Sequence, residues 1–482
     1  MGFLRVSGTS IVDESGSIVT FRGIGLAGWL DMENWIIGFP GHEQGIRDSL
    51  QQVLGKERAE FFFDRFIDNF FTDDDVKFIS SLGINVVRIP FRHGHLMRDD
   101  APFEVLEKGL LYLDRVVNSF AEHGIYTILD LHTVPGWQNQ DWHSDNPTHT
   151  AQFWRHRVFQ DRVVRLWEIL AARYAKNPWV AGYNPINEPA DPTGQIVVQF
   201  CGRLIEAIRS VDEKHIIFLD GNRYGMDFVG FGSPEPNVIY SPHDYPPPAY
   251  MPGSKYPGYC HLTHILEPEE DKTYGTPVIS QHDSPDQYFD KEAVERVFLG
   301  RSKYARETGT PIVVGEFNAI FTGDEESDAM RLQLLADQID IYKKHNAGWI
   351  YWGYKDIGVV SPLALGQDSE WLRRIRPIVE KKARLGVDLW GGSLDKIDHI
   401  MRPIKELFEL EFPTYSPFPF GAEFVINRIV PQILLAEAML PEFSESFRGM
   451  REEDIDDLMK SFHIENCQPR EQLLNLFRRS AG

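Results

Sequence analysis

The sequence has few cysteines and no uninterrupted apolar run that would cross a membrane. Its 3 cysteines, Cys201, Cys260 and Cys467, lie far apart and form no Cys-x-x-Cys pair. This pattern indicates neither a disulfide framework nor a cysteine-rich metal site, and it favours a reducing compartment. The most apolar late segment, residues 424–440, is interrupted by Arg428 and other polar residues. We therefore expect no stable membrane insertion there, because the segment is too short and too polar for a span.

Internal repeats and secretion signals are also absent. No repeat with a period of 20 to 50 residues is present, which argues against solenoids and propellers. The first residues show no basic segment followed by an apolar one. The one Asn-x-Thr triplet, Asn146-Pro147-Thr148, is excluded as a glycosylation acceptor by its proline. From these features we expect a soluble, cytoplasmic protein.

Positive charge is scarce. Against 71 Asp and Glu residues stand 49 Lys and Arg residues, which gives a formal net charge of −22. Such an excess repels phosphate backbones and anionic lipid surfaces, so we expect no nucleic-acid partner. Apolar residues make up 42% and charged residues 25% of the 482 residues, which is ordinary usage for a globular protein.

Eight short apolar runs, several followed by a helical pattern, dominate the first 356 residues. One helical face is formed by Leu106, Leu110, Leu113, Val117 and Phe120. Eight alternating strand and helix units predict an α/β fold of the (β/α)8 TIM-barrel type. An open doubly wound sheet is the alternative, but no Gly-x-Gly-x-x-Gly follows the first strand. The expected strands are residues 19–26, 84–89, 125–129, 180–183, 216–219, 238–240, 312–314 and 349–352.

The barrel carries two long connections and an extension. Residues 34–73 and 245–285 are too long for plain loops and are expected to form walls or lids beside a substrate. The strand pattern stops near residue 357, and helical patterns such as residues 452–462 follow. We therefore assign residues 1–412 to a catalytic barrel and residues 413–482 to a helical C-terminal extension. The extension is expected to pack on the barrel or to form contacts between subunits of an oligomer.

Polar residues collect where the apolar runs end. In a (β/α)8 barrel the loops after the strands converge on one mouth, which is where such folds carry their chemistry. A scatter of surface charges would not follow strand ends so regularly. The residues that follow the runs are Trp29 and Glu33, Arg88, Asp130 and His132, Asn187 and Glu188, His243 and Tyr245, Glu316 and Asn318, and Trp352.

Two of these residues are carboxylates that follow opposite strands. Glu188 follows the fourth strand and Glu316 the seventh, and these strands face each other across the mouth of an eight-stranded barrel. Facing buried carboxyls can divide their roles, one keeping its proton while the other stays ionised. Such a pair is what cleavage of a glycosidic bond requires, and a separation of about 5 to 5.5 Å would favour the retaining route.

The motifs together resemble glycoside hydrolase family 5, whose members are retaining barrel glycosidases. The resemblance extends from about residue 18 to residue 356, and the motifs follow the family's order. They are Val87-Arg88-Ile89-Pro90, Asp130-Leu131-His132, Pro135-Gly136-x-Gln138-Asn139, Asn187-Glu188-Pro189, His243-x-Tyr245, Gly315-Glu316-Phe317 and Trp352-x-Tyr354-Lys355.

This resemblance implies a role for each matching residue, with no cofactor and no metal. Glu188 would be the acid/base and Glu316 the nucleophile, which Arg88 would orient. Asn187 would bind the 2-hydroxyl of the sugar, and Trp352 would form the floor of the subsite. The remaining substrate-binding residues would be His132, Asn139, His243 and Tyr245.

The substrate is narrowed by the region around the first strand. Residues 25–35 resemble the corresponding region of exo-acting fungal β-glucanases, which implies that Glu33 contacts the far hydroxyls of the terminal sugar. Asp145 and Asn146, after the third strand, would assist it. A pocket of this kind releases one sugar at a time. We therefore expect a small-molecule β-glucoside or β-xyloside as the substrate.

Three alternatives remain open from the sequence. A glycolipid β-glucosidase is the nearest, because some family members carry C-terminal extensions and cleave glycolipids. A non-catalytic sugar-binding barrel belongs to another class. A metal-assisted barrel enzyme would use His132, His143 and His243, although these residues lack the spacing of a helical metal motif.

Overall fold

Eight parallel strands form one sheet that curls into a barrel, which confirms the predicted fold class. The computed structural model describes the whole chain except residues 1, 252, 261–286, 388–393 and 481–482. The hydrogen-bonded order of the strands is β11-β12-β3-β4-β5-β6-β7-β8. Their bounds are β3 Arg22–Gly25, β4 Val86–Arg92, β5 Tyr126–Thr133, β6 Val180–Asn184, β7 Ile216–Leu219, β8 Val238–Tyr240, β11 Val313–Phe317 and β12 Gly348–Trp352.

The segment after β8 closes the barrel against β11. The amide of Gly315 donates to the carbonyl of Pro242 at 2.9 Å, and the amide of Asp244 donates to the carbonyl of Glu316 at 2.8 Å. A glycine is needed at Gly315, because a Cβ there would lie 2.9 Å from Nε2 of His243. The closure therefore brings His243 directly beside Glu316.

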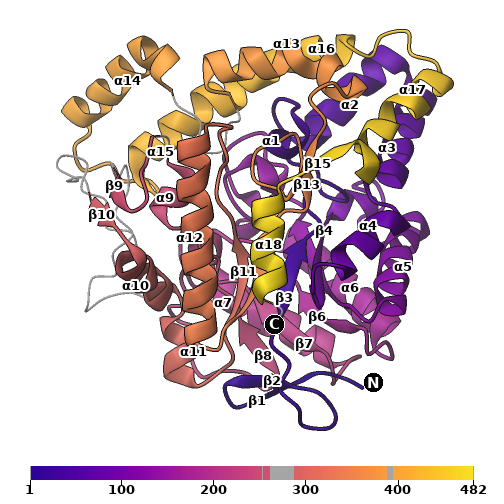
Figure 1. The fold of residues 1–482 in the computed structure, drawn as a ribbon, viewed down its shortest axis with the longest axis vertical. Helices are drawn as coiled ribbons and strands as arrows, with labels where there is room; N and C mark the ends of the chain where they lie inside the picture. Colours follow the sequence, from indigo (N-terminus) through magenta and orange to yellow (C-terminus); the bar gives the residue numbers. More distant parts are fainter. Residues whose placement is uncertain (1, 252, 261–286, 388–393, 481–482) are drawn as a thin grey trace.

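Helices surround the barrel and bury one apolar face each against the strands. Leu110, Leu113, Val117 and Phe120 of α5 are all at most 4% exposed, as their spacing predicts. The helix that follows β12 in the ring is α18, late in the chain (Figure 1). The helices around the strands are α4 Asp73–Ser80, α5 Glu107–Glu122, α6 Arg157–Tyr174, α7 Ile196–Arg209, α10 Lys291–Arg301, α11 Lys303–Thr308, α12 Glu325–Lys344 and α18 Glu471–Ser480.

The alternation of side chains along the strands puts polar residues at one level of the barrel. Val86 of β4 and Ile128 of β5 belong to an apolar cluster that also includes Ile11 of the hairpin β1 (Arg5–Ser7) and β2 (Ser10–Val12). Residues two positions further along a strand point to the same side. In β4 and β5 these residues are Arg88 and Asp130, which are at most 1% exposed. A buried polar layer therefore lies above an apolar one.

The first long connection is helical, and the second lies largely outside the described residues. Within residues 34–73 the structure has α1 Asn34–Ile37, α2 Glu43–Leu54 and α3 Lys56–Phe70 before α4 begins. The second connection contains α9 Pro247–Tyr250 and the hairpin of β9 Gly258–Cys260 with β10 Gln287–Phe289. The wall or lid predicted over residues 245–285 falls partly on residues 261–286, which the structure does not describe.

The C-terminal third is mostly helical, as expected, but the prediction that strands stop near residue 357 is wrong. Strand β14 pairs with both β13 and β15, so the extension is tied to the barrel by backbone hydrogen bonds. The assignment of a boundary at residue 412 stays a prediction. The elements are β13 Lys355–Asp356, β14 Leu363–Leu365, α13 Glu370–Leu385, α14 Asp398–Glu411, α15 Gly421–Arg428, the π-helical η5 Ile429–Leu435, α16 Ala436–Glu445, α17 Glu452–Met459 and β15 Cys467–Pro469.

The apolar segment 424–440 is part of a longer helix than the sequence suggested. The helix runs over Gly421–Glu445, and its 25 residues are long and apolar enough to cross a membrane by length and composition alone. The expectation that this segment is too short was therefore wrong. Only 28% of its most apolar stretch is buried, yet Met439 and Phe443 belong to the main core. One face of this helix therefore packs on the protein.

A buried ion pair joins the barrel, the first insertion and the extension. Nζ of Lys355 lies 2.8 Å from Oδ1 of Asp75, and neither side chain is exposed. The same ammonium group donates to the carbonyls of Phe70 at 2.9 Å and Phe462 at 2.6 Å. Asp75 also accepts from the hydroxyl of Tyr354 at 2.8 Å. One cation thus holds three segments that are far apart in the chain.

We expect Lys355→Met to destabilise the protein by about 3 to 5 kcal/mol, because the substitution leaves the Asp75 carboxylate buried without its partner. The measurement is urea unfolding followed by tryptophan fluorescence. Lys77→Met is the control, since it removes the exposed pair of Lys77 with Asp74 and such pairs contribute little. Equal unfolding midpoints for the two variants would contradict this role for Lys355.

Candidate active site

A buried arginine lies at the centre of the polar layer. Nη1 of Arg88 donates to Oε1 of Glu316 at 2.6 Å, and Nη2 donates to Oδ1 of Asn187 at 2.6 Å and to Oδ1 of Asn184 at 2.7 Å. The Asp130 carboxylate lies 3.2 Å from Nη2. Burial disfavours the charged guanidinium, but the carboxylates of Asp130 and Glu316 hold the pKa of Arg88 above its ordinary value. The arginine is therefore a fixed positive charge that orients three side chains.

Glu316, at the end of β11, is held by donors on both oxygens. Its Oε1 accepts from Arg88, and its Oε2 accepts from the Tyr245 hydroxyl at 2.8 Å. Nδ1 of His243 lies 3.5 Å from Oε2. Burial raises the pKa of Glu316, while His243 and Arg88 oppose that rise. The carboxylate is thus fixed in position and stabilised in its ionised form by two cations.

Glu188 follows β6 in a tight turn and accepts hydrogen bonds from two histidines. Its backbone is in the left-handed region, with φ of 43°, and its amide donates to Oδ2 of Asp220 at 3.0 Å. Nδ1 of His243 lies 2.7 Å from Oε1, and Nε2 of His143 lies 3.0 Å from Oε2. Burial alone would raise the pKa of Glu188, but the two histidines outweigh it and lower the pKa to about 2.

His143 and Glu188 share a proton as one coupled unit. Burial disfavours the charged imidazole, but the hydrogen bond and the charge of Glu188 raise the pKa of His143 to about 9. Two groups that interact this strongly titrate together rather than separately. The pair therefore carries one proton throughout the neutral range.

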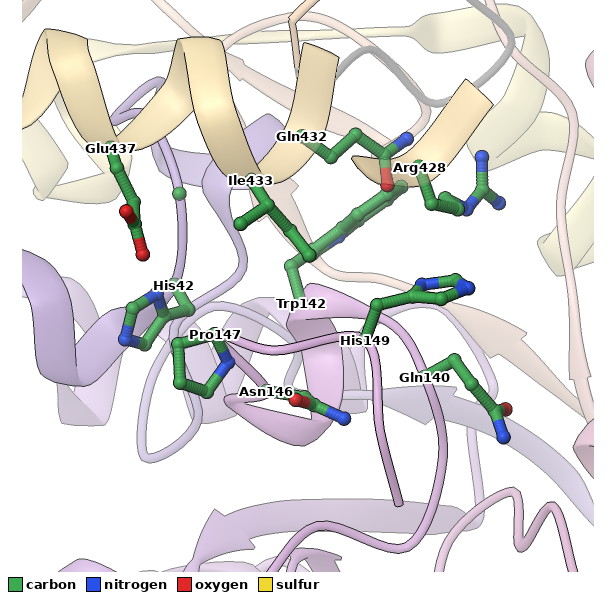
Figure 2. Close-up of a pocket in the computed structure, with 11 residues that line it drawn as sticks. His42, Gln140, Trp142, Asn146, Pro147, His149, Arg428, Gln432, Ile433 and Glu437 are labelled. Carbon is green, nitrogen blue, oxygen red and sulfur yellow. The ribbon is translucent and has the colours of Figure 1, made fainter. Parts of the chain in front are cut away.

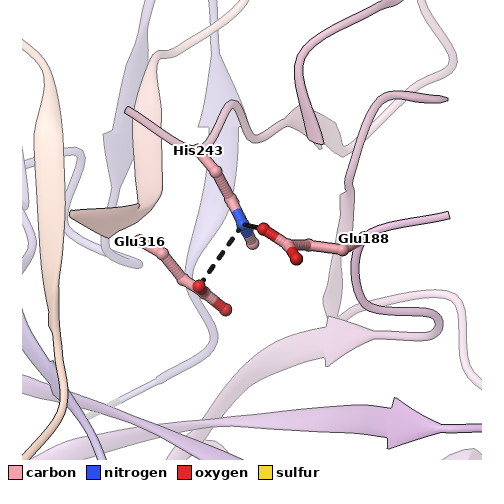
Figure 3. A group of neighbouring side chains, drawn as sticks. All are labelled: Glu188, His243 and Glu316. Atoms are coloured by element: carbon pink, nitrogen blue, oxygen red, sulfur yellow. Dashed lines mark hydrogen bonds and ion pairs between the residues drawn. The ribbon is translucent and has the colours of Figure 1, made fainter. Parts of the chain in front are cut away.

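The two glutamates and His243 converge on one point, as Figure 3 shows. One donor atom from each of Glu188, His243 and Glu316 lies within 4.8 Å of the other two, and all three residues are buried. This group could hold a cation by its spacing. However, all four carboxylate oxygens already accept hydrogen bonds from Arg88, Tyr245, His143 and His243. These side chains are therefore better suited to being hydrogen-bonded carboxylates than to binding a metal ion.

His132 is oriented by the polar layer and stacks on Trp352. Its Nδ1 lies 2.8 Å from Oδ2 of Asp130, and its Nε2 lies 3.2 Å from Nδ2 of Asn187. Donation from Nδ1 leaves Nε2 as an acceptor, and burial with the charge of Arg88 holds the pKa of His132 well below its ordinary value. The ring lies parallel to Trp352, with centroids 4.9 Å apart and an interplanar angle of 9°.

Glu33 lies at the N–H edge of the indole ring of Trp352. The indole N–H of Trp352 donates to Oε1 at 3.1 Å, and that of Trp35 donates to Oε2 at 2.7 Å. Glu33 is 3% exposed, and burial raises its pKa to about 7. The charge of Glu316 contributes to that rise. Glu33 therefore belongs to the same electrostatic environment as the two central glutamates.

Three residues predicted to bind the substrate form hydrogen bonds to other residues of the protein. Nδ2 of Asn139 donates to the carbonyl of Glu188 at 3.0 Å, and Nδ2 of Asn146 donates to the carbonyl of Asn139 at 2.7 Å. Oδ2 of Asp145 accepts from Nη2 of Arg92 at 2.6 Å. Their roles as sugar ligands stay predictions, but these contacts show that they shape the loop after β5.

Several residues of the site escaped the sequence reasoning. His143 was considered only as a metal ligand, although it contacts Glu188 directly. Asn184 and Asp220 join the polar layer, and the inward alternation that selects Arg88 would have found them. Asp31 is 3% exposed and lies 4.0 Å from Nε2 of His132. Burial and the charges of neighbouring carboxylates hold the pKa of Asp31 well above its ordinary value.

A separate pocket lies between the loop after β5 and the C-terminal helices. Figure 2 shows that Arg428, Gln432 and Glu437 reach into it from the helices, opposite the loop. It is lined by Gly41, His42, Gln140, Trp142, Asn146, Pro147, His149, Arg428, Gln432, Ile433 and Glu437.

A family model and several known proteins are similar to this chain. A family model described as cellulase (glycosyl hydrolase family 5) matches residues 56–358. A beta-xylosidase from Phanerodontia chrysosporium is 39% identical over 98% of this chain and 97% of that protein. A probable glucan 1,3-beta-glucosidase A from Aspergillus clavatus is 29% identical over 50% of this chain and 59% of its own. The crystal structure of a glycoside hydrolase superposes with a TM-score of 0.51 at 18% identity, covering 75% of this chain and 99% of that one, which supports the fold alone.

We expect the imidazole of His143 to titrate near pH 9 and to titrate at least one unit lower in Glu188→Gln, because the amide cannot stabilise the cation. NMR of ring-labelled histidine measures this, and His143→Gln assigns the signal. Because the folded pKa exceeds the ordinary value of 6.5, the stabilisation is complete below about pH 6.5 and is lost as the pH rises through about 9. An unchanged His143 signal in Glu188→Gln would contradict the coupling.

Proposed function

The chain belongs to glycosyl hydrolase family 5, and from that premise we propose that it is a retaining, exo-acting β-glycosidase. It releases terminal β-linked sugars of the glucoside or xyloside type from small glycosides. Glu188 serves as the acid/base and Glu316 as the nucleophile. Membership of the family makes the chain an O-glycosyl hydrolase, so a non-catalytic sugar-binding barrel is set aside.

The observation that carries the retaining mechanism is the short distance between the two glutamates. An oxygen of Glu188 and an oxygen of Glu316 lie within 4.8 Å of each other. Inverting enzymes place their carboxyl groups about 6.5 to 9.5 Å apart, because a water molecule must fit between one of them and the sugar. The shorter distance supports direct attack by a carboxylate on the anomeric carbon.

In the first step, an oxygen of Glu316 forms a bond to the anomeric carbon as the glycosidic bond breaks. Arg88 and Tyr245 hold the carboxylate by one oxygen each, which fixes its direction before substrate arrives. Positive charge develops on the sugar ring in the transition state, and the ionised glutamate stabilises it. The product of this step is a covalent glycosyl-enzyme, which water hydrolyses in the second step.

The leaving oxygen receives its proton from Glu188. We expected the surroundings to keep this residue protonated, but they lower its pKa to about 2 in the free site. The proton is instead available 3.0 Å away on His143, whose pKa is about 9. Glu188 therefore passes on a proton that the His143–Glu188 pair holds jointly. In the second step the same carboxylate takes a proton from the attacking water.

The residues around Trp352 form the pocket for the terminal sugar. His132 covers one face of the indole, and the opposite face suits stacking with the C–H groups of a pyranose. Glu33 lies at the indole N–H and accepts hydrogen bonds from the sugar's distant hydroxyls. Asn187, held by Arg88 and His132, binds the 2-hydroxyl next to the reacting carbon. A carboxylate at the far end blocks longer chains and makes the enzyme exo-acting.

The choice of sugar rests on the relatives. The relative that matches nearly the whole chain is a beta-xylosidase, and others are probable glucan 1,3-beta-glucosidases. We therefore propose xylosides and glucosides as the first substrates to test. A cytoplasmic location is a further proposal, supported by the free thiols of Cys201 and Cys467, and cell fractionation tests it.

A glycolipid β-glucosidase is the second candidate. Seven of the fifteen large apolar side chains that are exposed among the described residues lie between residues 400 and 434. They lie on α14, on the segment between α14 and α15, and on η5, and a lipid aglycone would benefit from such an apolar surface. Equal turnover of nitrophenyl β-glucoside and of a lipid β-glucoside would favour this candidate over the first.

We expect Glu316→Gly and Glu188→Ala to give azide products of opposite configuration. Without the nucleophile, azide takes the place of Glu316 on the α face of the sugar, displaces dinitrophenolate from a dinitrophenyl β-glycoside and forms the α-azide. Without the acid/base, azide attacks the covalent intermediate formed from dinitrophenyl β-glycoside and forms the β-azide, because this anion needs no base. NMR of the products identifies each case.

Measurements of the hydrolysis rate are the controls for the azide experiment. Glu316→Gln should lose several orders of magnitude in kcat, because no neighbour replaces the covalent step. Activity on nitrophenyl β-xyloside and β-glucoside should be unchanged by chelators, whereas a metal-assisted enzyme would lose it. Normal turnover by Glu316→Gln, or identical azide products from both variants, would overturn the assignment.

We expect Glu33→Gln to lower kcat/KM on nitrophenyl β-glucoside by about 10- to 100-fold, which corresponds to a hydrogen bond to a charged group. A 4-deoxy glucoside should be a poor substrate for the unmodified enzyme and should lose little further activity with the variant. This double comparison isolates the contact between Glu33 and the distant hydroxyl. A full additional loss on the deoxy sugar would show that Glu33 acts elsewhere.

A further inference from the structure

The C-terminal helix α15 contacts the loop that supports Glu188. Nε of Arg428, the last residue of α15, donates to Oδ1 of Asp141 at 2.7 Å. The guanidinium also lies over the ring of Trp142, 5.2 Å from its centroid, and over Phe424, 4.5 Å from its centroid. Asp141 is 7% exposed, so loss of Arg428 would leave a buried carboxylate without this partner. Figure 2 shows Arg428 beside Trp142.

Two residues further along the same loop, His143 reaches Glu188. Its Nε2 lies 3.0 Å from Oε2 of the glutamate. Asn139, on the other side of Asp141, donates to the carbonyl of Glu188, and its Oδ1 accepts from the amide of Asp141. Asp141 is therefore linked to Glu188 through its neighbours on both sides. A shift of Asp141 moves the side chain and the backbone contact of Glu188 together.

A second contact between the extension and the site supports the first. Phe420 stacks on Tyr224, with centroids 5.6 Å apart and an interplanar angle of 20°. The hydroxyl of Tyr224 donates to Oε1 of Gln140, directly before Asp141. Phe420 and Phe424 form one apolar cluster with Tyr224 and with Ala190, which follows Glu188 by two residues. The extension thus holds the loop after β5 and the turn of Glu188 against each other.

The backbone of this region requires outside support. Glu188, Tyr224, Asp145 and His149 all have φ between 43° and 63°, a region that side chains other than glycine rarely adopt. Such conformations persist when surrounding contacts determine them. The loop and the turn of Glu188 both take this form, and α15 contacts both.

We propose that Arg428 is a positioning residue for the acid/base function of Glu188, so that the C-terminal extension completes the catalytic site. This inference rests on the proposed function, in which Glu188 protonates the leaving oxygen. Arg428 fixes Asp141 by its ion pair and Trp142 by stacking. Through them it keeps His143 and Asn139 in the arrangement that presents Glu188 to the substrate.

The test compares leaving groups, because only poor ones need an acid. A dinitrophenolate departs without a proton, whereas an alkoxide requires one, and general-acid catalysis contributes about 10²- to 10⁴-fold. For Arg428→Gln we expect kcat/KM to fall about 10- to 100-fold on a methyl β-glycoside, comparable to the effect of misplacing a catalytic group. On the dinitrophenyl β-glycoside of the same sugar, the fall should be less than about threefold. Arg428→Lys should restore part of the loss.

Lys405→Gln is the matched control. Lys405 forms an ion pair with Glu423 of α15 at 2.7 Å, so its loss loosens the same helix without touching the loop. It should leave both substrates unaffected, with a melting temperature close to that of Arg428→Gln. Asp141→Asn keeps the shape of the loop and removes the charge, and it should repeat the selective loss if Arg428→Gln fails to fold.

Glu188→Ala distinguishes a failure of the proposed function from a failure of the positioning role of Arg428. If it shows no dependence on the leaving group, the proposed function fails. If it shows that dependence while Arg428→Gln and Asp141→Asn lose activity equally on both substrates, or not at all, only the positioning role is overturned.

Discussion

The site depends on one buried cation, the guanidinium of Arg88. Burying such a charge is costly unless every donor finds an acceptor, and here the acceptors come from several strands. Glu316 and Asn187 both accept hydrogen bonds from it at 2.6 Å, so the proposed nucleophile and the proposed sugar-binding amide are held by the same side chain. The barrel supplies the rigid frame, since Arg88 and Asp130 stand one layer above a wholly apolar cluster. The position of Glu316 is thereby set by the strand register.

The proposed acid/base, Glu188, is held in place differently. Glu188 stands in a turn and is held by His243 and His143, and the second of these belongs to a loop. The surroundings therefore shift the pKa values of the two glutamates in opposite directions, although both residues are buried. Burial raises the pKa of Glu316, while two histidines lower that of Glu188. In the proposed mechanism the reaction therefore draws on a proton held by His143 beside Glu188, so the loop that carries His143 takes part in the proton transfer.

The sequence predicted well whatever follows from strand periodicity. The eight strands and the positions of Arg88, Glu188 and Glu316 could be located because polar residues follow the apolar runs at the ends of the strands. It could not predict that Asp145 would pair with Arg92, since that contact depends on a loop with a left-handed residue. The protonation of Glu188 was misjudged for the same reason, because His143 arrives from this loop. Nor does local patterning reveal that Arg428, far along the chain, lies over Trp142.

The position of α18 has a consequence for biosynthesis. Phe477 packs against Trp349 and Tyr351 of β12, with centroids 5.8 Å and 5.1 Å apart, so this helix covers a strand made long before it. While a ribosome is still adding the intervening residues, the outer face of β12 has no cover, and partly folded chains of this size are prone to aggregate. Nascent chains halted before residue 471 should therefore engage chaperones that recognise exposed apolar surface, and release should follow translation of α18.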